Sequence, residues 1–170
     1  MVIPALIYAG IILGIIIIHS IIVDILEANF STYNRVAGIV IPFAGVVYAI
    51  YGFRKEYNND IISYNKALKF GVFVSLIIGL VSSVFSFLYT HYINPELLEI
   101  GKQMAEERLI ERGMSDEMIE MALKQQEKFQ KPVFLIIIGT IVTTLIGTII
   151  SLIAASILKK EPKDPFADVE

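Results

Sequence analysis

Residues 132–158 read PVFLIIIGTIVTTLIGTIISLIAASIL and contain no ionisable side chain. About 20 consecutive apolar residues are enough for a helix to cross the hydrocarbon core of a bilayer. Lys159 and Lys160 follow directly and end the uncharged stretch. The sequence therefore predicts a transmembrane helix over 132–158.

Small residues recur every four positions inside this stretch. Residues four apart share one face of an α-helix. Helices in a bilayer associate through close backbone approach and hydroxyl hydrogen bonds, because lipid tails are as apolar as leucine and give no hydrophobic drive. We therefore expect this face to pack against another helix. The row consists of Gly139, Thr143, Gly147, Ser151 and Ala155.

Charged residues occur in clusters along the chain, although 55% of its residues are hydrophobic. An ionisable group is costly inside a bilayer, so long uncharged windows predict spans and charged windows predict loops. Four uncharged windows occur, and they predict an all-α integral membrane protein built as a four-helix bundle. The expected spans are about 2–25, 36–53, 68–92 and 132–158.

The third expected span repeats the small-residue pattern of the fourth. Gly71, Ser75, Gly79 and Ser83 are four residues apart. Because these two spans are consecutive in the chain, the simplest arrangement packs the two rows on each other. The alternative is that each row faces a different helix or a second subunit.

Residues 95–130 are charged but keep a helical period. Gly113 stops a first helix and Ser115 begins a second one. We therefore expect an extramembrane helical hairpin at 95–130, between spans three and four. The tail at 161–170 contains Pro162 and Pro165 and is expected to be disordered.

Basic residues beside the span ends indicate how the chain is oriented. Four spans place both termini on one side, and Lys and Arg next to a span favour the cytoplasm. In the hairpin, basic residues are spread out and outnumbered by acidic ones. We therefore expect cytoplasmic termini and an extracytoplasmic hairpin. The basic residues at the cytoplasmic span ends are Arg54, Lys55, Lys66, Lys69, Lys159 and Lys160.

His19 is the titratable residue that lies deepest in an expected span. An intramembrane ionisable residue suggests a proton relay or a metal ligand. His91 has a similar outer position in span three, and Asp24 and Glu27 lie in the first loop. These four residues are candidates for a metal or proton site. The alternative is interfacial hydrogen bonding, which the five-residue spacing of His19 and Asp24 favours, because it separates their helix faces.

Most function classes have no signal in this sequence. The chain contains no cysteine, which excludes disulfides and thiolate metal sites, and it carries no phosphate-binding or catalytic motif. The net charge of −3 is divided among loops and indicates no nucleic-acid partner. We therefore expect no enzyme, no cofactor and no bound metal.

Four segments carry a family resemblance. Residues 62–71 read ISYNKALKFG, 94–96 read NPE, 113–116 read GMSD, and 157–160 read ILKK. Together they resemble an uncharacterised family of four-span bacterial inner-membrane proteins, a domain of unknown function frequent in Bacteroidota. The resemblance implies an inner-membrane location and supplies no activity and no catalytic residues.

The arrangement of spans and hairpin favours a function in protein–protein interaction. We expect a scaffold or accessory subunit of a membrane assembly that lies in the lipid bilayer and binds a protein partner or itself through its spans or its hairpin. The alternative is a transporter or channel for a small solute or ion, working as an oligomer, in which the serine and threonine rows line a pore. Such proteins usually carry broken helices at mid-depth, and Pro42 in the second span is the one candidate for a break.

Overall fold

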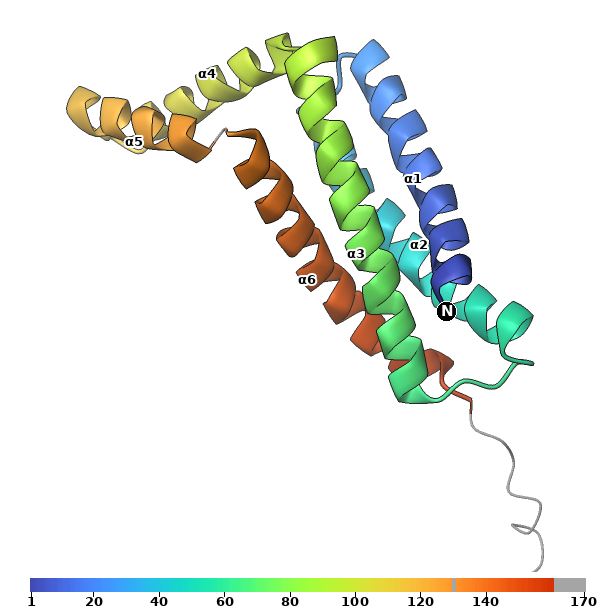
Figure 1. Cartoon of the computed structure of the whole chain (residues 1–170). Helices are drawn as coiled ribbons and strands as arrows, with labels where there is room; N and C mark the ends of the chain where they lie inside the picture. Colours follow the sequence, from blue (N-terminus) through green and yellow to red (C-terminus); the bar gives the residue numbers. More distant parts are fainter. Residues whose placement is uncertain (130, 161–170) are drawn as a thin grey trace, which may run out of the picture. The chain divides into compact units, whose positions relative to one another are not determined.

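The computed structural model describes residues 1–129 and 131–160, and its helices are shown in chain order in Figure 1. The helices are α1 (Val2–Ile25), α2 (Thr32–Tyr57), α3 (Tyr64–Leu88), α4 (Glu96–Glu111), α5 (Asp116–Phe129) and α6 (Pro132–Leu158). A π-helical segment, η1 (Tyr89–Ile93), continues α3.

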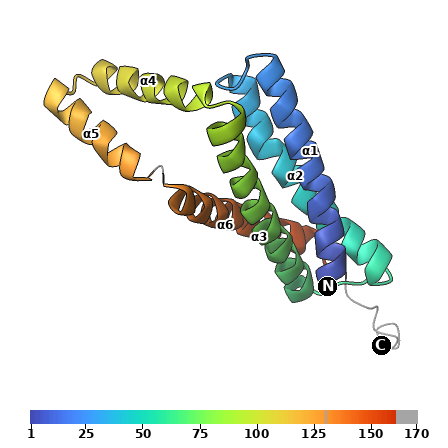
Figure 2. The same ribbon diagram turned by 45° about the horizontal axis from the view of Figure 1, so that its top comes forward.

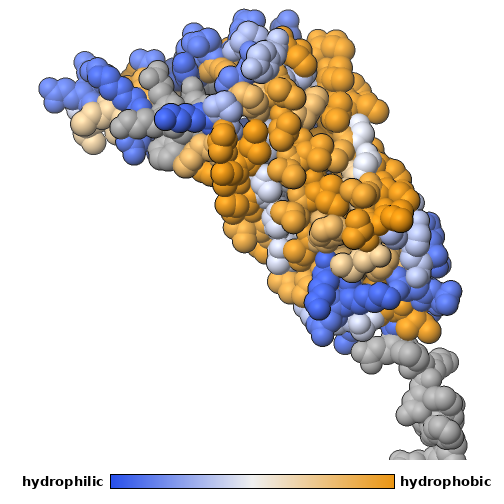
Figure 3. Space-filling view, viewed as in Figure 1, coloured by the Kyte–Doolittle hydropathy of each residue, from blue (hydrophilic) through white to orange (hydrophobic). Residues whose placement is uncertain are grey.

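Four helices in the described part of the chain are long and apolar enough to cross a membrane, namely α1, α2, α3 with η1, and α6. The protein is therefore an all-α, multi-pass membrane protein, and the expected fold class is confirmed. Apolar side chains cover much of the face shown in Figure 3. The tail at 161–170, for which the sequence predicts disorder, lies outside the described residues.

Some helices extend beyond the spans that the sequence predicts, whereas α6 has the predicted bounds of 132–158. The clearest example is α2, which the sequence places at 36–53 and which runs from Thr32 to Tyr57. Its first turn is capped by Ser31, whose Oγ accepts a hydrogen bond of 3.1 Å from the N–H of Asn34. Charged residues at both ends stay helical, because long side chains can direct their charged groups toward water.

Contacts between residues divide the chain into two units. The first unit contains residues 1–79 and 141–160, and the second contains residues 80–140. Figures 1 and 2 show α1 beside α2 in the first unit and α5 folded back on α4 in the second.

Aromatic rings fill the core of the first unit. Phe70 is fully buried and stacks on Phe53 of α2, with ring centroids 3.8 Å apart. Tyr8 of α1 meets Phe70 edge-on at 6.3 Å, and its hydroxyl donates a hydrogen bond of 2.9 Å to Glu56 Oε2. Gly52 leaves room for this tyrosine, because a Cβ at that position would lie within 3.0 Å of the hydroxyl.

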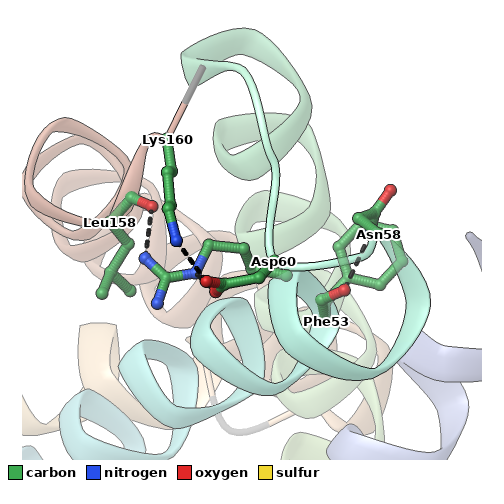
Figure 4. A network of polar contacts seen from close by, with 6 residues as sticks. Phe53, Asn58, Asp60, Leu158 and Lys160 are labelled. Atoms are coloured by element: carbon green, nitrogen blue, oxygen red, sulfur yellow. Dashed lines mark hydrogen bonds and ion pairs between the residues drawn. The ribbon is translucent and has the colours of Figure 1, made fainter. Parts of the chain in front are cut away.

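A polar clasp joins the α2–α3 loop to the end of α6 (Figure 4). Arg54 Nη1 donates a hydrogen bond of 3.0 Å to the carbonyl of Leu158, and Arg54 Nε lies 3.0 Å from Asp60 Oδ1. Lys160 forms an ion pair with the other oxygen of Asp60. Ile62 and Lys160 exchange two backbone hydrogen bonds of 2.9 Å. Because carbonyls at a helix C-terminus lack intrahelical donors, Arg54 also satisfies the end of α6.

The clasp should weaken in acid. The hydrogen bond from Lys160 is the main cause that lowers the pKa of Asp60, and the charges of Lys160 and Arg54 add to it. A lowered pKa contributes stability that is complete above the unfolded value of about 3.9 and is lost as the pH falls through the folded value. We therefore expect the melting temperature of wild type in detergent to fall more steeply below pH ~4 than that of Asp60→Asn. Parallel pH profiles of the two proteins would contradict this role of Asp60.

Candidate functional site

Within the first unit, α3 and α6 present their small residues to each other. A Cβ added to Gly71 would lie within 3.0 Å of Ser151 Oγ, and a Cβ added to Gly147 would lie within 3.0 Å of Ser75 Oγ. A step of four residues forward along α3 thus matches a step of four residues backward along α6. The two helices are therefore antiparallel at this contact, and each of these glycines faces a serine. Ala155, the last member of its row, is also buried in this unit.

The second unit contains a third pair of the same kind. A Cβ added to Gly139 would lie within 3.0 Å of Ser83 Oγ. Ser83 and Gly139 are two further steps of four along α3 and α6 from Ser75 and Gly147. Glycine again faces serine, so the same pairing rule holds in each unit taken by itself.

The hydroxyl groups at these contacts bond along their own helices. Ser75 Oγ donates to the carbonyl of Gly71 at 2.8 Å, and Ser151 Oγ donates to the carbonyl of Gly147 at 2.6 Å. The sequence suggests hydroxyl bonds between helices, but these two donors are used within a helix, as serine can do with the carbonyl four residues earlier. The contribution of these serines to packing is therefore their small size.

A cavity of about 100 Å³ lies beside this contact, between α2, α3 and α6 of the first unit. Ser75, Thr143 and Gly147 from the predicted rows line it together with Gly38 and Pro42 of α2. Pro42, Ser75, Thr143 and Gly147 lie near the middle of their helices, so the cavity is at mid-depth of the spans. The rest of its wall is apolar and consists of Ile39, Val46, Ile78, Ile146 and Ile150.

The polar groups of the cavity come from three sources. Pro42 has no N–H and cannot donate to the carbonyl of Gly38, four residues earlier. Ser75 and Thr143 add hydroxyl oxygens to the same wall. A mostly apolar pocket with a few polar groups suits a small neutral molecule that carries a hydrogen-bonding group. The sequence indicates Pro42 and the two rows separately, and it gives no sign that they meet at one depth.

Two of the three titratable residues near the α1–α2 connection, His19 and Asp24, have local contacts. The His19 ring lies 5.9 Å from the ring of Tyr33. Asp24 Oδ1 accepts a hydrogen bond of 2.9 Å from Asn29 Nδ2. Glu27 lies in the connection with a φ of 51°. Asp24 thus has the kind of hydrogen bond that the interfacial interpretation expects, whereas His19 Nε2 is buried with no hydrogen-bond partner among the described residues.

His91 belongs to the second unit and lies in η1. Its Nδ1 is 3.1 Å from the carbonyl of Phe87, and the two rings pack with centroids 4.2 Å apart. Within residues 1–129 and 131–160, no group of three or more His, Asp or Glu residues is placed to hold a metal ion. The described residues therefore do not assemble the candidate metal site.

Comparison with known proteins gives one result. A family model described as a protein of unknown function (DUF4199) matches residues 7–160. No curated protein and no solved structure gives a match. The matched region begins within α1 and includes the hairpin and the end of α6.

Proposed function

Because the chain belongs to the DUF4199 family of unknown function, its activity must be inferred from its own residues, and we propose that it is a scaffold or accessory subunit of a membrane assembly. Its recognition surface is the hairpin formed by α4 and α5. The partner is a membrane-associated protein or a second copy of this chain. That the family is frequent in Bacteroidota stays a prediction.

Exposed apolar side chains on the hairpin are the observation that carries this proposal. Met118 and Met121 on α5 are 49% and 63% exposed, and Ile110 on α4 is 57% exposed. No residue of α4 is buried. Charged residues keep these helices out of hydrocarbon, so lipid does not explain the exposure. Methionine is adaptable and is over-used at protein-binding surfaces.

The proposed location is the inner membrane of a bacterium, with cytoplasmic termini and an extracytoplasmic hairpin. Lys66, Lys69 and Lys159 are exposed near the ends of their spans, where basic residues favour the cytoplasmic side. Nine acidic residues outnumber six basic ones between positions 95 and 131. A reporter fused after Gly113 should therefore be extracytoplasmic, and a cytoplasmic reporter would overturn this orientation.

The double variant Met118→Ser, Met121→Ser should lose its partner. The variant removes the two exposed methionine side chains that we propose as anchors, and truncation of an anchor costs roughly 1 kcal/mol or more of binding free energy. Recovery of the crosslinked partner should therefore fall at least about tenfold. The measurement is crosslinking in membranes, followed by purification of the full chain and identification of what is attached. The matched control is Gln103→Ser, Gln125→Ser on the same hairpin. Equal recovery with both double variants, or no partner with wild type, would contradict the proposal.

A second candidate function is transport of a small solute, and the mid-depth cavity beside Pro42 favours it. If the cavity binds the solute, Thr143→Val should reduce flux into liposomes while keeping the shape of the wall. The hairpin double variant should leave that flux unchanged. Liposomes that contain the wild-type protein and show no flux would exclude the transport function for the solutes tested.

A further inference from the structure

An open pocket of about 600 Å³ lies in the first unit, where α1 begins, α2 ends and α3 follows. Ile3, Phe53, Tyr57, Asn58 and Lys66 are among its lining residues. We propose that this pocket binds an anionic phospholipid, with the phosphate at Lys66 and the start of an acyl chain along the apolar wall. The site is independent of the hairpin and of the function proposed for it.

Charge complementarity favours an anionic ligand at this pocket. No lining residue is acidic. Lys66 is exposed, and its ammonium donates a hydrogen bond to Asn58 Oδ1 and lies 5.9 Å from the ring centroid of Phe53. The ion pairs formed within the described part of the chain do not include Lys66. Its positive charge is therefore held in place by neutral groups and is not neutralised by a carboxylate.

The pocket also has the layout that an amphiphile requires. Lys66 lies in the first turn of α3, and Lys69 is three residues further along the same face and is also exposed. Besides Lys66, the wall includes the apolar residues Ile3 and Phe53 together with Tyr57, and tyrosine is typical of the bilayer interface. A free inorganic anion would make no use of the apolar wall. Lysines beside a span attract anionic lipids, so a phospholipid fits both parts of the pocket.

Native mass spectrometry of the full chain in neutral detergent tests this inference. Phosphatidylglycerol and phosphatidylcholine with identical acyl chains are titrated separately, and the apparent affinities are compared. Wild type should bind phosphatidylglycerol more tightly. Lys66→Gln should weaken phosphatidylglycerol binding about fivefold, the effect of one lysine near an anionic surface, and leave phosphatidylcholine binding unchanged. The matched control, Lys55→Gln, removes an exposed lysine that does not line the pocket, and it should keep the preference.

Two further variants make the test independent of the Lys66–Asn58 hydrogen bond. Lys66→Arg keeps the charge and should keep the preference for phosphatidylglycerol. Ile3→Glu places a carboxylate in the pocket at a side chain that is 72% exposed, and it should weaken phosphatidylglycerol binding even if Lys66→Gln fails to fold. Equal binding of the two lipids to wild type, equal losses in Lys66→Gln and Lys55→Gln, or displacement of the lipid by inorganic phosphate would overturn the proposal.

Discussion

The substitution Gly71→Leu should lower the free energy of unfolding by about 3 kcal/mol, the upper end of the usual cost of overpacking. A Cβ at this position would already lie within 3.0 Å of Ser151 Oγ and Ile50 Cδ1. A leucine would therefore force α3 away from α6 and from α2. Unfolding of the purified protein in mixed micelles of increasing SDS content, followed by circular dichroism, measures the change.

Gly14→Leu is the matched control for this substitution. Apart from its chain neighbours and the nearby backbone of α1, no atom lies within 4 Å of a Cβ added to Gly14. The same change should therefore leave stability unchanged or raise it by less than about 1 kcal/mol, because leucine favours the helix more than glycine does. Equal losses for Gly71→Leu and Gly14→Leu would show that close packing of α3 on α6 is not what stabilises the bundle.

The substitution Phe70→Ala should cost about 3–5 kcal/mol, the range for a buried aromatic residue replaced by alanine. The ring of Phe70 is fully buried and contacts Phe53 of α2 and Tyr8 of α1. Its removal would leave a cavity where three helices meet. The same unfolding experiment measures this loss.

Phe43→Ala provides the comparison for Phe70→Ala. Phe43 lies on α2 and is 42% exposed, so its replacement removes fewer protein contacts. We expect a loss below about 1 kcal/mol. A loss at Phe43 as large as that at Phe70 would contradict the assignment of Phe70 to the core.

The spans could be predicted from the sequence because charge is costly in lipid, and an uncharged window of 27 residues leaves little choice for Pro132–Leu158. The same reasoning underestimates helix length. Hydropathy marks the part of a helix that lies in hydrocarbon, and α2 continues into Arg54 and Lys55 at its end. The start and end of such a helix depend on caps and side-chain reach, which hydropathy does not measure.

The small-residue rows could be found from their four-residue spacing, but their pairing could not. Spacing shows that Gly71 and Ser75 share a face, and it does not show that Gly71 meets Ser151. That pairing depends on the antiparallel register of α3 and α6, in which glycine on one helix faces serine on the other. The alternation of glycine and hydroxyl residues in both rows is the signal that could have indicated it.

The clasp and the cavity depend on contacts between distant parts of the chain. Asp60 and Lys160 are 100 residues apart, and neither carries a motif that predicts the other. Pro42 meets Ser75 and Thr143 at one cavity because three helices cross at a particular depth. The periodicity of a short stretch carries no information about contacts between distant residues. The clasp and the cavity could therefore be found only from the structure.

Disulfide formation between α3 and α6 tests the register most directly. The chain contains no cysteine, so introduced pairs react without competition. A Cβ added to Gly139 lies 3.2 Å from Ser83 Cβ, close to the separation of about 3.5–4.5 Å that a disulfide needs. Oxidation with copper phenanthroline in membranes should therefore link Ser83→Cys, Gly139→Cys rapidly and link Ser83→Cys, Leu135→Cys, one helical turn out of register, slowly or not at all. A faster link in the out-of-register pair, or no link in either, would contradict the pairing of the two helices.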